Sequence, residues 1–96
     1  MSLVKNIIFV LLSSSLFATT IQEVYNNAPS LNGYDKYLIL DPSITYVGGL
    51  GVFEGDVFIE GNGAVIDLDD SGGLWAFADE EYPASLSVEY CSIINS

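Results

Sequence analysis

Apolar residues in most of this chain fall into short runs that are separated by turn-forming residues. A representative unit is residues 56–68, where two apolar runs are joined by Gly61-Asn62-Gly63. Short apolar runs bounded by Gly, Pro, Asn or Asp are typical of β-strands, because these residues supply the turn conformations. We therefore expect strands over residues 37–41, 44–47, 50–53, 56–60, 64–68 and 74–78, with a further set from residue 85 to residue 94.

The strand–turn–strand layout occurs three times along the chain. The equivalent apolar pairs are Ile39 with Ile44, Ile59 with Ala64, and Val88 with Ile93, so that successive copies are 20 and 29 residues apart. Stacked repeats tolerate loops of unequal length while their strands stay constant. The pattern predicts a coiled, parallel arrangement with three short strands in each turn of the chain. An antiparallel meander with a hairpin at Asn62-Gly63 is the structural alternative.

A short helix is expected before the strands. Thr20 and Glu23 have the spacing of a capping box, and apolar residues follow at helical spacing until Pro29. We expect one amphipathic helix over residues 21–28. Its apolar side is suited to covering the open end of the strand array, where a core and a strand edge would otherwise face water.

The first 18 residues have the pattern of a secretory signal peptide. Lys5 precedes an apolar run at residues 7–12, and small residues lead to Ala18, after which we expect cleavage, with Thr20 as the second choice. The apolar run is shorter than the roughly 20 residues that a membrane span needs. The predicted location is secreted, periplasmic or at the cell surface, without membrane insertion after cleavage.

Three segments follow from these patterns. Residues 1–18 form the signal peptide, residues 19–36 the capping helix and turn, and residues 37–96 the first coils. The sequence ends inside the third copy without a closing cap. We therefore expect the N-terminal part of a longer protein.

The net charge and the residue types of the chain exclude some classes of function. The chain has 13 acidic residues and two basic ones, a formal net charge of −11 and no histidine. Nothing could neutralise nucleic-acid phosphates, so nucleic acid is excluded as a partner. Nucleophilic catalysis that needs histidine is excluded for these residues. Cys91 is the only cysteine and is expected to be a small buried hydrophobe, with a reactive or intermolecular thiol as the alternative.

The chain resembles the right-handed parallel β-helix proteins of the pectate-lyase-like superfamily. The similarity begins at Ile21-Gln-Glu and Ala28-Pro29 and continues through the segments 37–46, 57–67 and 86–95. It implies an all-β fold, a right-handed parallel β-helix with a short N-terminal capping helix. Many members act on polysaccharides as lyases, hydrolases or epimerases, and others are adhesins. None of the catalytic motifs of these enzymes matches a position here, so the catalytic residues stay unknown and enzymatic activity stays open.

An acidic loop follows the second copy of the layout. Asp67, Asp69 and Asp70 precede Ser71 and two glycines, and hard oxygen ligands in a glycine-containing turn are what Ca²⁺ prefers. A calcium site formed by these three aspartates is one hypothesis, although the spacing does not match an EF-hand loop. A solvated loop between strands is the other interpretation.

A second acidic loop, at residues 79–83, lies beside two aromatic residues. Trp75, Asp79 and Glu80 are candidate polysaccharide-binding residues, because an indole beside carboxylates offers a stacking surface for sugars. Trp75 and Phe77 alternate with alanines, which makes burial in the core the more strongly favoured interpretation. Tyr46 and Tyr90 are expected to be buried at the corners of the coils.

Together these patterns predict an exported β-helix protein that binds or processes polysaccharide. A non-catalytic surface or adhesion solenoid is the alternative. The acidic surface expected for this protein disfavours a polyanionic substrate unless Ca²⁺ bridges the charges. Sequence alone leaves the substrate and the oligomeric state undetermined.

Overall fold

Short strands make up most of the regular structure. The computed structural model describes residues 19–70 and 72–96, so the expected signal peptide lies outside the described residues. The elements are β1 (Thr19–Thr20), α2 (Ile21–Asn27), β2 (Lys36–Ile39), β3 (Thr45–Val47), β4 (Leu50–Val52), β5 (Gly55–Glu60), β6 (Val65–Asp67), β7 (Leu74–Ala76), β8 (Ala84–Glu89) and β9 (Ser92–Ile94). The all-β prediction is confirmed, with each expected strand within two residues of its predicted ends. Strand β1 was not expected.

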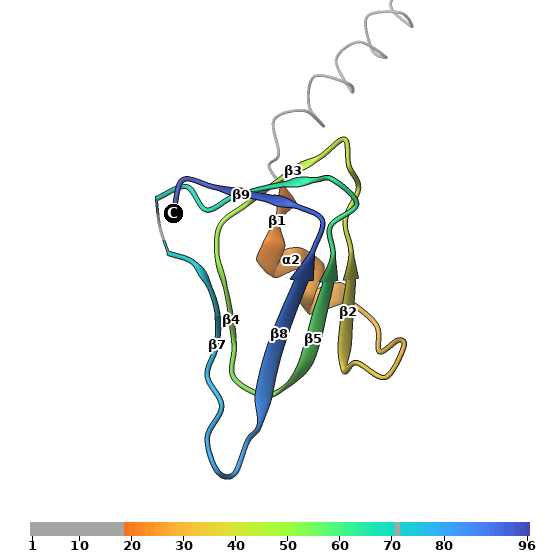
Figure 1. Ribbon diagram of the computed structural model, residues 1–96, viewed down its shortest axis with the longest axis vertical. Coiled ribbons are helices and arrows are strands. Elements are labelled where there is room, and N and C mark those ends of the chain that lie inside the picture. The colour runs from red at the N-terminus through yellow and green to blue at the C-terminus, as the bar shows by residue number, and fades with distance from the viewer. Residues whose placement is uncertain (1–18, 71) are drawn as a thin grey trace, which may run out of the picture.

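The strands form three parallel sheets that the chain visits in turn. Their orders are β1-β3-β6-β9, β2-β5-β8 and β4-β7. Figure 1 shows β2, β5 and β8 side by side, with β4 and β7 forming another side of the molecule. Every pairing between these strands is parallel, which contradicts the antiparallel meander. Gly61-Asn62-Gly63 is therefore no hairpin turn, since it leads from β5 in one sheet to β6 in another.

The register differs in part from the expected one. Ile59 pairs with Val88 as predicted, but its partner on β2 is Leu38, not Ile39. Leu38 is buried, whereas Ile39 is 57% exposed. Because side chains alternate between the two faces of a strand, a shift of one residue exchanges the buried and exposed sets. In the third copy Ile93 pairs with Ile66 and not with Ala64, because the turn before β9 is shorter than the turn before β6.

The core lies between the three sheets. Leu38 and Ile59 are buried neighbours in one sheet, and Tyr46 and Ile66 are buried neighbours in the next. Burial decreases toward the last strands, where Ile93 is 46% exposed. The prediction of a buried Tyr46 is confirmed, and its hydroxyl accepts a hydrogen bond of 2.7 Å from the Asp41 amide.

Helix α2 packs against this core beside the first strands. The Thr20 hydroxyl accepts a 3.1 Å hydrogen bond from the Glu23 amide, which confirms the predicted N-cap. Ile21 is fully buried, and Val24 and Tyr25 pack against the core cluster. The helix lies behind β5 and β8 in Figure 1. Within residues 19–70 and 72–96, no helix is both long and apolar enough to cross a membrane.

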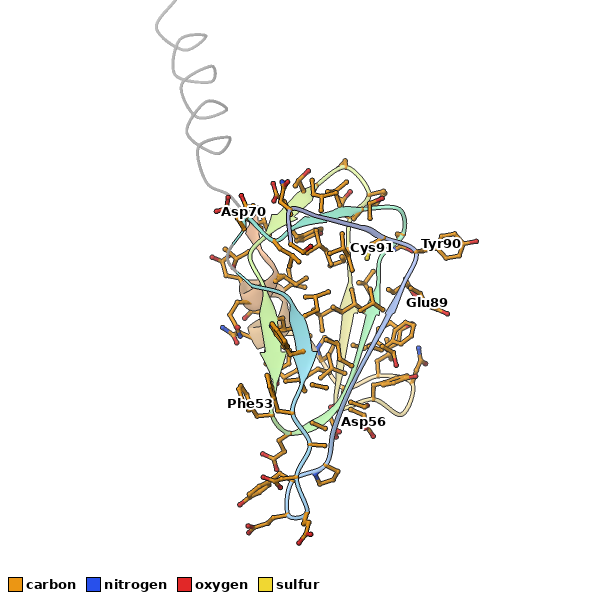
Figure 2. The ribbon with its side chains drawn as sticks, turned by 60° about the vertical axis from the view of Figure 1, so that its left-hand side comes forward. Phe53, Asp56, Asp70, Glu89, Tyr90 and Cys91 are labelled. Atoms are coloured by element: carbon orange, nitrogen blue, oxygen red, sulfur yellow. The ribbon has the colours of Figure 1, made fainter. Side chains whose placement is uncertain are left out.

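Two residues near the last turn differ from expectation. Tyr90 is 87% exposed, so the prediction of a buried corner tyrosine is wrong. Its φ of 55° turns the chain sharply between β8 and β9, and Figure 2 shows its side chain pointing away from the molecule. Cys91 is half-buried against the core cluster, and burial raises the pKa of its thiol.

Successive turns contact each other through their backbones at Gly61. The Gly61 and Gly63 amides donate to the carbonyl oxygens of Glu89 and Tyr90, over 2.8 and 2.6 Å. A Cβ on Gly61 would lie 2.5 Å from both of these oxygens, whereas a Cβ on Gly63 would meet nothing within 4 Å. Close stacking of the two turns therefore requires glycine at position 61.

We expect Gly61→Ala to destabilise the protein more than Gly63→Ala does. Overpacking against rigid backbone should lower the free energy of unfolding by about 3 kcal/mol. Gly63 has a φ of +87°, so alanine there should cost only about 1 kcal/mol of left-handed strain. Urea unfolding of the two variants measures the difference. Equal losses would contradict the stacked arrangement of the turns.

Candidate functional site: an exposed aromatic row

The outer face of the β4–β7 sheet carries Trp75, one of the predicted binding residues, together with other aromatic residues. Leu50 and Val52 of β4 are buried, which leaves Gly51 pointing outward between them. Gly51 pairs with Trp75 of β7, so the indole lies on the same outer face. Phe53 and Phe77 follow one step beyond the ends of these two strands. Alternation along two neighbouring strands thus brings three aromatic residues together.

Phe53, Phe77 and Trp75 form what we call the aromatic row. The Phe53 and Phe77 rings stack with centroids 5.0 Å apart and planes 12° apart, and Phe77 and Trp75 stack at 5.9 Å and 20°. The three side chains are 66%, 48% and 52% exposed, in the order Phe53, Phe77, Trp75. Burial of Trp75 and Phe77 in the core, the interpretation that the alternating alanines favoured, is therefore wrong. Contiguous exposed aromatic surface of this kind commonly marks a binding site.

Glycines make room for the rings. A Cβ on Gly51 would lie 3.3 Å from the Phe53 ring and 3.8 Å from the Phe77 ring. A Cβ on Gly73 would lie 3.3 Å from the indole of Trp75. The three rings therefore lean over bare backbone, and larger residues at these two positions would displace them.

A cleft of about 640 Å³ adjoins the Phe53 end of the row. Phe53 and Gly51 line one part of it, and Tyr25 of α2 lines another. Tyr82 and Pro83, from the loop before β8, complete its apolar lining. In Figure 2 Phe53 lies on the opposite side of the molecule from Glu89 and Tyr90. The row and the cleft share Phe53 and form one continuous surface.

The charged groups in this cleft are mostly acidic. Asp35, Glu54 and Glu81 line it together with Lys36. The Lys36 ammonium lies 5.1 Å from the centroid of the Tyr25 ring and donates to the Asn26 carbonyl over 3.3 Å. One lysine and three carboxylates therefore line the cleft, and part of the hydrogen-bonding capacity of the lysine is already used by α2.

The predicted polysaccharide-binding residues make different contacts in the structure. Trp75 belongs to the aromatic row, whereas Asp79 organises its own loop. The Asp79 carboxylate accepts hydrogen bonds from the amides of Glu81 and Tyr82, over 2.9 and 2.6 Å. Glu80 is exposed in the same loop. Asp79 thereby holds Tyr82 beside the cleft, which is a positioning role.

The predicted calcium loop gains no support from the geometry. The Asp67 carboxylate accepts hydrogen bonds from the Asn95 side chain (3.0 Å) and from the Asp69 amide (2.8 Å). Asp69 and Asp70 have φ values of 56° and 54°, so the strand does not continue and the three carboxylates are not aligned. Among the described residues, no group of three His, Cys, Asp or Glu side chains could hold a metal ion. Calcium binding stays a prediction that titration calorimetry can test.

A second aromatic cluster was missed by sequence reasoning. Tyr34, Tyr37 and Phe58 pack together on the outer face of the β2–β5–β8 sheet, with centroids 5.1 to 6.0 Å apart. The Tyr37 hydroxyl donates to Glu60 over 2.9 Å, and the carboxylate raises the pKa of Tyr37. Tyr37 is buried and the other two rings are half-buried, so this cluster mainly covers its own sheet.

Comparison of the chain with models of protein families, with curated proteins and with solved structures finds no significant match.

The bonds at Asp67 predict a pH dependence of stability. The Asn95 amide and the Asp69 N–H lower the pKa of Asp67 below its ordinary value. Because the pKa of Asp67 is lower in the folded protein, these hydrogen bonds stabilise the fold fully above the unfolded pKa of about 3.9. This stabilisation is lost as the pH falls through the folded pKa. We expect Asp67→Asn to lose less stability than the wild type between about pH 5 and pH 2.5.

Urea midpoints across this pH range measure the effect. Asp70→Asn is the matched control, because its carboxylate accepts no hydrogen bond in the part of the chain that the structure describes. It should follow the wild-type profile. A wild-type slope in Asp67→Asn would show that the bonds at Asp67 are not linked to folding.

Proposed function

We propose that this chain belongs to an exported parallel β-helix protein that binds polysaccharide through the aromatic row. The three parallel sheets support the β-helix part, since the chain visits them in a fixed cyclic order. The stacked, exposed rings of Phe53, Phe77 and Trp75 carry the functional part. Export follows from the signal-peptide pattern of residues 1–18.

A sugar polymer fits the shape and chemistry of this surface. The C–H-rich faces of sugar rings pack on aromatic side chains, while their hydroxyls stay available to neighbouring polar groups. The row places three exposed aromatic side chains next to one another, which matches an extended polymer better than a single small molecule. The adjoining cleft adds Tyr25, Tyr82 and several carboxylates as hydrogen-bonding groups.

The proposal is limited to binding. Most glycosidases use two catalytic carboxylates held at a fixed separation. In the described loop Asp79 is engaged with backbone amides, and Glu80 is exposed. The aromatic row therefore supports a stacking surface, which a polysaccharide-processing enzyme and a non-catalytic adhesin would share.

We expect Trp75→Ala to weaken binding to an uncharged polysaccharide by about tenfold or more. Loss of one stacked aromatic surface of a few kcal/mol would produce this change. Affinity electrophoresis in gels that contain soluble cellulose or xylan derivatives measures it. Tyr90→Ala is the matched control, because Tyr90 is also exposed but lies away from Phe53. Full affinity of Trp75→Ala would contradict the proposed site.

Gly51→Ala tests the arrangement of the rings without removing any of them. The added methyl group would lie 3.3 Å from the Phe53 ring, so this ring would have to shift by a few tenths of an ångström relative to Phe77. We expect weaker polysaccharide binding, by about threefold to tenfold, together with a changed near-ultraviolet circular dichroism spectrum. Unchanged binding alongside a changed spectrum would show that the stacking geometry is irrelevant to the ligand.

A further inference from the structure

We infer that the ligand of this surface is a glycan that carries free amino groups, with an ammonium group bound in the cleft beside Phe53. This inference rests on the proposed function and names its substrate class. The evidence for it is the set of residues that line the cleft, among which carboxylates outnumber basic groups.

The cleft combines the two features that bind ammonium groups. Phe53 and Tyr82 supply aromatic rings, and ring faces attract cations through their quadrupole. Glu54 and Glu81 supply carboxylates that are exposed to solvent. Aromatic rings and carboxylates around one concavity favour a cation over a neutral group, and a neutral group over an anion.

An ammonium group of the protein itself already lies at one aromatic ring of the cleft. The Lys36 Nζ atom lies over the Tyr25 ring and donates to the Asn26 carbonyl. One carboxylate of the cleft is also partly engaged, since Asp35 Oδ2 accepts a 2.8 Å hydrogen bond from the Asp56 amide. After these contacts, Glu54 and Glu81 are the carboxylates left to pair with a ligand.

The carboxylates of the cleft disfavour binding of glycans that carry negative charge. A chain of uronic acids would place carboxylates next to Glu54 and Glu81 and beside the acidic loop at residues 79–81. Lys36 is the only basic residue after residue 18, so little compensation is available. Like-charge contacts would reduce both the association rate and the affinity.

The test compares oligosaccharides of equal length that differ in charge. Titration calorimetry at about pH 5.5, where carboxylates are ionised, is run with hexamers of β-1,4-linked glucosamine, N-acetylglucosamine and glucose, and with oligogalacturonate. We expect the glucosamine hexamer to bind about fivefold more tightly than the two uncharged hexamers at low salt. The advantage should disappear in about 0.5 M NaCl, because salt screens exposed charges. Oligogalacturonate should not bind.

Charge variants locate the effect in the cleft. Glu54→Gln and Glu81→Gln should each remove about half of the preference for glucosamine over glucose, because glutamine keeps a hydrogen-bonding group and removes the charge. Glu89→Gln is the matched control, because this exposed glutamate lies on the far side from Phe53. It should retain the full preference.

The outcomes separate the inference from the function on which it rests. Equal binding of glucose and glucosamine hexamers, with loss of both in Trp75→Ala, would overturn the amino-glycan inference and keep the glycan-binding function. A glucosamine preference that survives both glutamine variants would also overturn the inference. Failure of every hexamer to bind would overturn the proposed function together with it.

Discussion

Parallel pairing of β2, β5 and β8 is the constraint on which the rest of the structure depends. It places Leu38, Ile59 and Val88 next to one another, and the first two of these side chains are fully enclosed by the core. Strands of this length are too short to be stable alone, so each one gains stability from the neighbours above and below it. The stacked backbone at Gly61 and the packing of α2 against the core both follow from this arrangement.

The aromatic row is a consequence of the same pairing in another sheet. Parallel register between β4 and β7 sets Gly51 opposite Trp75, which frees space for the rings that lean over it. Phe53 and Phe77, 24 residues apart in sequence, become stacked neighbours because each follows its strand by one residue. The proposed binding surface therefore lies on two paired strands and on the residues directly after them, and its rings lean over bare backbone.

Strand positions were predictable from the sequence because turn residues mark their ends so clearly. The register was predictable only in part, since Leu38 and Ile39 are both apolar and nothing in the sequence says which one faces the core. The exposure of Trp75 was missed for a similar reason, because large aromatic residues between alanines resemble a core face. Tyr90 was expected inside, but the positive φ at this corner turns its side chain outward. The cleft could not be predicted, since it is formed by α2, the end of β4 and the loop before β8, which are far apart in the sequence.

Fluorescence of Trp75 tests the central claim most directly, because it is the only tryptophan in the chain. The measurement is quenching by acrylamide, an uncharged quencher, with and without a saturating amino-glycan oligosaccharide. An indole that is about half exposed should be quenched readily in the free protein and protected when sugar rings cover it. Binding of the oligosaccharide without any protection of Trp75 would place the ligand elsewhere and contradict the assignment of the aromatic row as the binding surface.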